Sequence, residues 1–377
     1  MRSSAESRTD GSAAPAVAEG PDRFSTLLSD LGRRLSLDLG RWLRRRHAAI
    51  RTEAGDATAE LTDRLEDLVQ RGGKRLRPAL VYYAYHGSGG ALDGQVLPAA
   101  MAAEVLHAYL LVHDDIMDRA ETRRGAPAAH LAFRDHHRQA GWPGEADLHG
   151  QAAAILLGDL AHGYAVELFL ATEPRPSDWS EVVAAFTAMC SEVVIGQYLE
   201  MTAPFRGESS EEELLRILRL KSGRYTVERP IEIGARLAGV PPPALEALAR
   251  FGREVGEAFQ LKDDLLGVFG ERDAVGKPVG GDLKEGKHTV LIHHTLAAAS
   301  GGERRRVEAV LGNPVATSTQ VDEACRVIEA VGARARVETM VEERIATARR
   351  VIDELELTGD GRDFFIGLLR FLKERRT

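Results

Sequence analysis

Apolar residues recur at helical spacing in segment after segment of this chain, and this periodicity constrains the fold more than any other feature. Leu61, Leu65 and Leu68 are one example, and their helix is expected to stop at Gly72-Gly73. Only 6% of the residues are aromatic, while alanine and leucine are abundant, which favours helix over strand. No reliable strand alternation and no repeat of fixed period accompany this pattern. The sequence therefore predicts an all-α fold of more than ten helices. They are expected from Phe24, from Pro78, and over 98–118, 151–170, 180–201, 210–220, 225–237, 243–268, 290–299, 318–331, 334–357 and 361–375.

One large domain is expected. The 377 residues are 44% apolar, which is enough for a sizeable core. Residues 1–23 are rich in Ala, Ser, Gly and Pro and lack periodicity, so we predict a disordered tail followed by a single domain over 24–377. Residues 134–147 combine Gly, Pro, Trp and charges, and we predict a surface loop there.

Charge and cysteine content exclude several classes of protein. The net charge of −8 argues against a dedicated nucleic-acid binder. Cys190 and Cys325 form no CxxC or His/Cys ligand set, and we expect two reduced packing residues. No run reaches the ~18 apolar residues of a transmembrane helix, and the N-terminus lacks the apolar core of a secretory signal. We therefore expect a cytoplasmic protein without a transmembrane segment.

Two acidic clusters follow apolar stretches. His113-Asp114-Asp115-Ile116-Met117-Asp118 comes directly after the apolar run 108–112, and Asp263-Asp264 closes another apolar-rich segment. On a helix, Asp114 and Asp118 lie one turn apart on one face, with Asp115 beside them. Adjacent carboxylates repel one another unless a positive group occupies the site. Oxygen-only ligands suit Mg²⁺, which binds one or two carboxylates together with water and substrate phosphate.

Cations lie close to both clusters in the sequence. Gly72-Gly73-Lys74-Arg75-Leu76-Arg77-Pro78 places three cations at a predicted helix start, where backbone N–H groups also favour a diphosphate. Arg123-Arg124 follows the first acidic cluster, and planar guanidinium groups bind phosphate oxygens well. Lys221-Ser222 adds a cation with a hydroxyl, and Lys277 lies in a glycine-rich segment able to close over an anion. The chain has no nucleophile elbow and no Walker loop. These residues indicate a metal-assisted reaction on diphosphates.

Four of these motifs, in this order, resemble those of the trans-isoprenyl diphosphate synthases, the polyprenyl synthetase family. They are GGKRLRP, HDDIMD followed by RRG, FQLKDD, and GKP…GDLKEGKHT. The resemblance extends from about residue 36 to the C-terminus and is strongest to a bacterial short-chain geranylgeranyl diphosphate synthase. It implies a helical bundle around a central apolar cavity, an enzyme that is a prenyltransferase, and a homodimer.

The resemblance also implies roles for individual residues. Metal ligands would be Asp114, Asp115 and Asp118 for two Mg²⁺ ions, and Asp263 and Asp264 for a third. Isopentenyl diphosphate would bind Lys74, Arg77, His107 and Arg124. The allylic diphosphate would lie among Arg123, Lys221, Ser222, Gln260 and Lys277, with Lys287 on a closing loop and Gln197 as a polar pocket residue. The catalytic set would be Asp114, Asp115, Asp118, Arg123, Lys221, Gln260, Asp263 and Lys277.

The reaction implied is ionisation, condensation and elimination. Mg²⁺ and the cations would stabilise the leaving diphosphate, isopentenyl diphosphate would attack the allylic cation, and a proton would leave to the departed diphosphate. Apolar helices would keep water from the cation. No dedicated protein base is then required, which agrees with the lack of an obvious candidate.

Two departures from the family pattern keep an alternative open. The second motif reads Asp263-Asp264-Leu-Leu-Gly267, so its third aspartate is missing, and Gly281 precedes Asp282 where relatives often have an acid. If the last aspartate acts only through other groups, Gly267 is tolerable. If it is essential, the chain would be a weakly active or partner-dependent subunit. Every cation expected to face a diphosphate is retained, and this favours the active enzyme.

Product length is predicted from the residues before the first motif. Leu110 and Tyr109 lie four and five residues before Asp114, about one turn deeper along the helix. In the family, a bulky residue five positions before this motif limits the length of the product, so Tyr109 favours C15 to C20. The first motif also lacks the two-residue insertion of the usual bacterial farnesyl diphosphate synthases. The resemblance therefore implies geranylgeranyl diphosphate (C20), with farnesyl diphosphate (C15) as the alternative. If Tyr109 packs away from the pocket, this argument fails.

Two further hypotheses come from other enzyme classes. A class I terpene cyclase also uses DDxxD and Mg²⁺, but it does not need GGKRLRP or the paired arginines. A metallophosphohydrolase is suggested by His113-Asp114 with His107 nearby, although such sites use more widely separated histidines.

Overall fold

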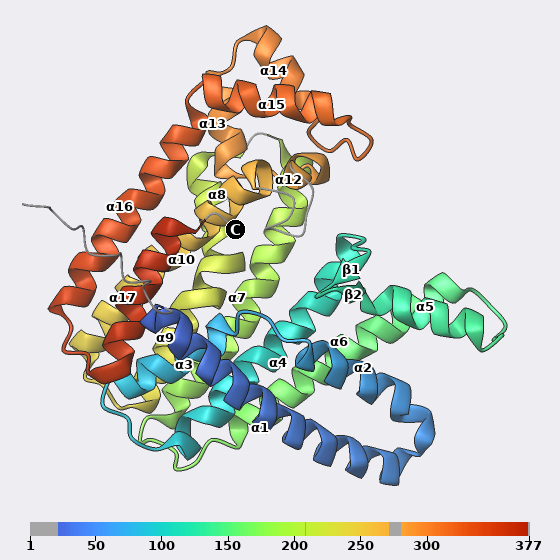
Figure 1. Ribbon diagram of the computed structural model, residues 1–377, viewed down its shortest axis with the longest axis vertical. Helices are drawn as coiled ribbons and strands as arrows, with labels where there is room; N and C mark the ends of the chain where they lie inside the picture. Colours follow the sequence, from blue (N-terminus) through green and yellow to red (C-terminus); the bar gives the residue numbers. More distant parts are fainter. Residues whose placement is uncertain (1–21, 208, 271–279, 376–377) are drawn as a thin grey trace, which may run out of the picture.

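The computed structural model describes residues 22–207, 209–270 and 280–375, and these are mostly helical (Figure 1). The first half comprises α1 (Arg23–Ala54), η1 (Asp56–Thr58), α2 (Ala59–Gln70), α3 (Leu76–Gly87), α4 (Asp93–Met117), β1 (Thr122–Arg123), β2 (Ala126–Pro127), α5 (Ala129–Gln139), α6 (Ala146–Leu170) and α7 (Trp179–Arg206). The second half comprises α8 (Glu211–Leu218), η2 (Arg219–Glu228), α9 (Arg229–Leu237), α10 (Pro242–Phe269), α12 (Gly281–Glu285), α13 (Val290–Ala298), α14 (Gly301–Glu308), α15 (Ser318–Ala330), α16 (Ala333–Glu354) and α17 (Gly359–Glu374). The predicted all-α class with more than ten helices is confirmed.

Helix α4 lies inside the larger of two hydrophobic cores. It packs against α6 over most of its length and also contacts α2, α3, α5 and α9. Val96, Leu106 and Val112 are buried on different sides of the helix, as expected for a helix covered by neighbours all round. This packing fixes the carboxyl end of α4, where the first acidic cluster lies.

Helix α10 runs through both cores. Phe251 and Val255 in its first half are buried with the larger core, whereas Leu261 and Leu265 belong to a second core shared with α13, α15 and α16. Because both halves of the helix are anchored, the aspartate pair beside Leu265 is held on a rigid element.

The segment η2 is a π-helix between α8 and α9, and glycines let its neighbours approach closely. A β-carbon at Gly256 of α10 would lie only 2.5 Å from the carbonyl oxygen of Gly223, and one at Gly196 of α7 would lie 2.6 Å from Cα of Lys221. Both glycines are therefore required for backbone contact. Helices α7 and α10 thus hold η2, with Lys221 and Ser222, between them.

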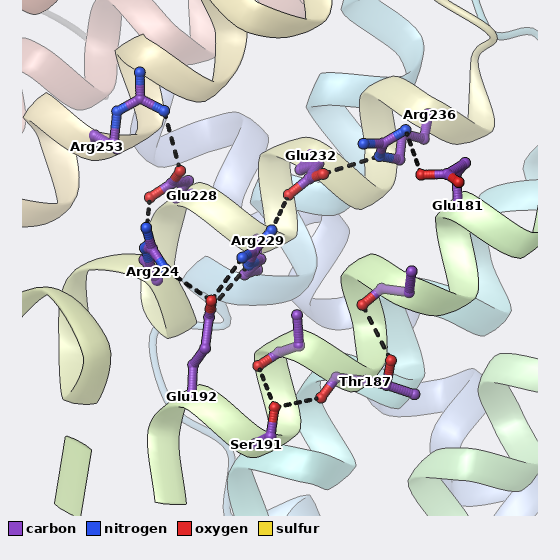
Figure 2. A network of polar contacts seen from close by, with 12 residues as sticks. Glu181, Thr187, Ser191, Glu192, Arg224, Glu228, Arg229, Glu232, Arg236 and Arg253 are labelled. Carbon is purple, nitrogen blue, oxygen red and sulfur yellow. Dashed lines mark hydrogen bonds and ion pairs between the residues drawn. The ribbon is translucent and has the colours of Figure 1, made fainter. Parts of the chain in front are cut away.

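An arginine–glutamate network fastens η2 and α9 to α7 (Figure 2). Glu192 of α7 accepts hydrogen bonds from Nη1 of Arg224 at 2.8 Å and from Nε and Nη2 of Arg229 at 2.9 and 2.6 Å. Nη1 of Arg229 also donates to Glu232 at 2.5 Å. Since these side chains are largely buried, the network fixes the orientation of η2.

Several predicted boundaries were wrong. The predicted surface loop over 134–147 is helical up to Gln139 and again from Ala146, because α5 and α6 pack on each other and override the Gly/Pro signal. The two-residue strands β1 and β2 form a small antiparallel hairpin that the sequence did not reveal. Short α12 and α14 were also missed, and α1 starts one residue earlier than expected. The predicted tail lies outside the described residues except for Asp22 and Arg23.

Three helices are long and apolar enough to cross a membrane by length and composition alone. They are α4, α6 and α7. In the bundle, 61% of the most apolar window of α4 is buried. The prediction that the chain has no transmembrane segment is therefore not confirmed by helix length and hydropathy.

Candidate active site

The first acidic cluster lies where α4 ends and the β1–β2 hairpin begins. Asp115 is buried and accepts a hydrogen bond from Nε of Arg123 at 2.8 Å. Burial raises the pKa of the Asp115 carboxyl, and the Arg123 guanidinium opposes that shift. Arg123 is thus held by Asp115, the residue predicted as a metal ligand.

Asp114 and Asp118 face residues from other helices. Nε2 of Gln197 on α7 lies 3.4 Å from Oδ1 of Asp114. Partial loss of hydration and the charge of Asp114 raise the pKa of Asp118 to about 6, while Lys287 and Lys221 oppose the shift. The two lysines therefore act electrostatically on the first acidic cluster although they belong to distant segments of the chain.

The second aspartate pair lies on α10. Asp264 is buried, and its Oδ1 accepts a hydrogen bond from Nε2 of Gln260 at 2.8 Å. Burial, together with the charges of Asp282 and Asp263, raises the pKa of Asp264 to about 8, against the effect of Gln260. Asp263 forms an ion pair with Nη1 of Arg375 at 2.6 Å. Arg375 was not predicted as a site residue, because it lies more than a hundred residues away in the sequence.

Two lysines, Lys221 and Lys287, lie near the aspartate motifs. Lys221 is ion-paired with Glu200 of α7. Lys221, Ser222, Gln260 and Asp264 all line one small pocket. Lys287 bridges Asp282 at 3.0 Å and Glu285 at 2.8 Å. Burial opposes the charge of Lys287, but these carboxylates raise its pKa above the ordinary value. Lys277, predicted for the same region, lies outside the described residues.

The glycine-rich loop before α3 carries Lys74 close to the second motif. Partial loss of hydration and the Arg375 charge lower the pKa of Lys74, while Asp263 opposes the shift. The Lys74 ammonium lies 5.5 Å from the Phe371 ring of α17. The loop, α10 and the C-terminal helix thus meet at one place.

A buried carboxylate that the sequence did not reveal organises two arginines behind this loop. Glu104 of α4 is 2% exposed and is ion-paired with Arg75 and, at 3.1 Å, with Nη2 of Arg124. Arg124 also donates to the carbonyl of Leu68 at 3.0 Å. An acidic residue within the apolar stretch before the first motif was the available signal. Arg124 is thus anchored beneath the loop, against Gly73.

Arg77 and His107 meet at Tyr225. The Arg77 guanidinium lies 4.4 Å from the Tyr225 ring and donates to Oγ1 of Thr226 at 2.7 Å. The Tyr225 hydroxyl lies 3.0 Å from Nδ1 of His107. Desolvation and the nearby arginines, Arg77 first among them, lower the pKa of His107 well below its ordinary value. His107 is therefore neutral, and its partner Tyr225 comes from η2.

Comparison with known proteins decides the family. A model of the polyprenyl synthetase family matches residues 58–328, which include both aspartate motifs. The chain belongs to the polyprenyl synthetase family.

Named relatives narrow the activity within this family. The geranylgeranyl diphosphate synthase of Methanosarcina mazei is 32% identical over 76% of this chain and 82% of its own length. The (2E,6E)-farnesyl diphosphate synthase of Mycobacterium bovis is 35% identical over 70% of this chain and 68% of its own length. A solved geranylgeranyl pyrophosphate synthase of Corynebacterium glutamicum, complexed with isoprenyl diphosphate and magnesium, has a TM-score of 0.87, 30% identity, and coverage of 93% of this chain and 99% of its own. This polyprenyl synthetase is therefore a short-chain prenyltransferase, as its motifs predicted, and not a phosphohydrolase.

The donor chemistry of this polyprenyl synthetase fits Mg²⁺. Among the described residues, no three His, Cys, Asp or Glu side chains are placed to hold a metal ion by themselves. Mg²⁺ binds one or two carboxylates and completes its shell with water and substrate phosphate. Asp114, Asp118, Asp263 and Asp264 offer only oxygen donors, and like charges raise the pKa of Asp118 and Asp264 beyond the effect of burial.

Tyr109, the residue predicted to limit product length, lies on α4 where this helix faces α6. The Tyr109 ring lies 4.8 Å from the His113 ring and 5.2 Å from the His162 ring, and both contacts are edge-on. Tyr109 and Leu110 are half-buried against the larger core. Contacts with His113 on one side and His162 on the other hold the tyrosine ring in place.

Proposed function

We propose that this enzyme condenses isopentenyl diphosphate with an allylic diphosphate, head to tail, to make geranylgeranyl diphosphate. One observation carries the proposal. The charges of Lys221 and Lys287 oppose the rise in the pKa of Asp118 of the first motif. Lys221 also lines one pocket together with Asp264 of the second motif. Lys221 is therefore close to both aspartate motifs, and Lys287 adds a second cation near Asp118. This arrangement suits a diphosphate that leaves as an anion.

Magnesium would be held by the aspartates of both motifs, three ions with substrate bound. When bound, it supplies charge stabilisation for the departing diphosphate. Lys221 and Lys287, with Lys277 of the glycine-rich segment, would bind the same diphosphate. Arg123 has a different part: its ion pair with Asp115 holds the end of α4 in position. Gln260 and Gln197 orient Asp264 and Asp114 respectively through their hydrogen bonds.

Isopentenyl diphosphate would bind at the glycine-rich loop before α3. Lys74 is exposed there, and the Arg124 guanidinium lies directly beneath Gly73. Arg77 extends this positive surface towards Tyr225, and the neutral His107 adds a polar group without charge. Attack by the substrate double bond forms the new carbon–carbon bond, and the proton released passes to the departed diphosphate.

A C20 product is supported by the position of Tyr109 and by relatives named for that product. A half-buried tyrosine fixed by His113 and His162 would act as a floor one turn below Asp114. Farnesyl diphosphate is the second candidate, because a relative of similar identity is named for it.

We also propose a homodimer in the cytoplasm. Leu148 and Leu156 of α6 and Tyr198 and Phe205 of α7 are exposed, and α6 and α7 are consecutive helices in the chain. Exposed apolar surface of this kind marks protein contact sites. A second copy would cover it, and the long apolar helices α6 and α7 would then be bundle helices instead of membrane spans. Light scattering on purified protein would give twice the 41.0 kDa of one chain.

Prenyl transfer is tested with purified protein, Mg²⁺, labelled isopentenyl diphosphate and C5, C10 or C15 allylic diphosphate in separate reactions. The proposal expects labelled prenyl diphosphates, lost with EDTA and with Asp114→Ala. Inorganic diphosphate without label transfer would indicate hydrolysis. Cyclic hydrocarbon from a C20 substrate alone would indicate a terpene cyclase. No turnover unless another protein is added would indicate a partner-dependent subunit.

A further inference from the structure

The missing third aspartate of the second motif leaves a space that another carboxylate fills. Gly267 lies four residues after Asp263, so a side chain at this position would project on the same face of α10 as Asp263. A β-carbon placed on Gly267 would overlap the carboxylate of Asp282 and would lie 3.2 Å from its Cβ. The Asp282 carboxylate therefore occupies the volume that a side chain at residue 267 would need.

The backbone holds Asp282 in this place. The N–H of Gly280 donates to the carbonyl of Val268 at 3.2 Å, which ties the start of α12 to the end of α10. Gly280 has a φ of +71°, a left-handed conformation that glycine adopts without strain. The approach of α12 to α10 is thus fixed one residue beyond Gly267, independently of any side chain.

The side chain of Asp282 is fixed as well. Its Oδ1 accepts from Nζ of Lys287 at 3.0 Å, and its backbone carbonyl accepts from the Lys287 N–H at 3.1 Å. The side chain is 13% exposed. Asp282 therefore lies against the face of α10 that carries Asp263, although 18 residues separate it from Asp264 in the sequence.

We infer that Asp282 replaces the absent aspartate at position 267, so that the second motif is completed by a carboxylate from α12. The inference rests on the proposed function. Asp282 is a positioning residue: it supplies the third negative charge beside Asp263 and Asp264 and anchors Lys287 above them. Gly267 is required because a larger residue would displace the Asp282 carboxylate. The departure from DDxxD is thus compensated within the chain, and no partner subunit is needed to explain it.

An aspartate exchange tests this inference. Asp282→Gly and the isosteric Asp282→Asn each remove the carboxylate, whereas Gly267→Asp/Asp282→Gly returns one to α10. Binding is followed by the thermal unfolding midpoint at a fixed concentration of inorganic pyrophosphate. The readout is the Mg²⁺ concentration at which this midpoint has risen by half of its maximal increase. Prenyl transfer is measured in parallel. Each single Asp282 variant is expected to raise the Mg²⁺ requirement by about 10- to 100-fold, the usual effect of removing a group that supports metal ligands. The exchange variant is expected to recover most of this loss in both readouts.

Glu285→Gln is the matched control, because it removes a carboxylate from Lys287 without changing the space at Gly267. It is expected to change the Mg²⁺ requirement much less than Asp282→Asn. The inference is overturned if the exchange variant, folded by circular dichroism, is no better than Asp282→Gly. It is also overturned if Glu285→Gln equals Asp282→Asn. Suppose that Mg²⁺ and pyrophosphate stabilise the wild type and that the exchange variant recovers this response, but that no prenyl transfer occurs. That result would reject the proposed function and retain this inference. A wild type with no Mg²⁺ response would reject both.

Discussion

Arg375, next to the carboxyl end of α17, forms an ion pair with Asp263 of the second aspartate motif at 2.6 Å. The Arg375 guanidinium also lies 4.9 Å from the Phe259 ring of the same helix α10. The C-terminal segment therefore covers Asp263, a predicted metal ligand.

Substitution of Arg375 is expected to ease metal binding. Mg²⁺ and the guanidinium compete for Asp263, and a partly exposed ion pair contributes about 1 kcal/mol, which corresponds to about fivefold in affinity. Arg375→Ala should lower the Mg²⁺ concentration needed for thermal stabilisation with pyrophosphate by about that factor. Arg370→Ala, whose side chain is exposed on the same helix, is the control. Equal midpoints for Arg375→Ala and wild type would exclude the competition.

Glu192 is expected to contribute strongly to stability. Its carboxylate accepts three hydrogen bonds from Arg224 and Arg229, and its removal leaves Glu228 and Glu232 to pair with these two guanidinium groups in a mostly buried site (Figure 2). Glu192→Gln should lower the free energy of unfolding by about 2–4 kcal/mol in urea denaturation. Glu212→Gln, at an exposed pair on α8, should change it by less than about 0.5 kcal/mol. A loss at Glu192 no larger than that at Glu212 would contradict this role.

Stability is expected to fall in mild acid, partly because of His107. The folded chain keeps His107 neutral, since its pKa lies well below 6.5, whereas the unfolded chain takes up a proton as the pH falls through 6.5. Each pH unit below 6.5 should then cost about 1.4 kcal/mol from this residue. His107→Gln should reduce the slope of unfolding free energy against pH between pH 6 and 5. An unchanged slope would show that His107 is protonated in the folded protein.

Truncation of Tyr109 is expected to lengthen the product. Its ring, held by His113 and His162, is the proposed floor of the chain pocket, and removal would open space below Asp114. Tyr109→Ala should shift products from C20 towards C25 and longer by mass spectrometry. Tyr109→Phe retains the ring and should retain C20. The same product length in both variants would show that Tyr109 does not line the pocket.

Local patterns in the sequence were sufficient for much of this architecture. Helical spacing and Gly/Pro punctuation predicted the long helices, and spacing within α4 placed Asp114 and Asp118 on one face. Segments that lie far apart in the sequence, such as those that contain Asp118 and Lys221, lie close together in the structure. These features depend on contacts within a few residues or on motifs already known from the family.

The remaining features depend on tertiary contacts that a single sequence does not reveal. The π-helix η2 requires close approach at Gly196 and Gly256, which lie on two other helices. Glu104 lies in an apolar stretch of the sequence, and only the fold brings its partners Arg75 and Arg124 to it. In the same way, Gly267 looked like a defect because nothing local links it to Asp282.

The length of the product made by the wild-type enzyme tests the central claim most directly. Purified protein with Mg²⁺, dimethylallyl diphosphate and excess isopentenyl diphosphate should yield mainly the C20 trans-prenyl diphosphate by liquid chromatography and mass spectrometry. Accumulation of C15 as the final product would contradict the assignment of chain length. Absence of any elongated prenyl diphosphate would contradict the proposed function itself.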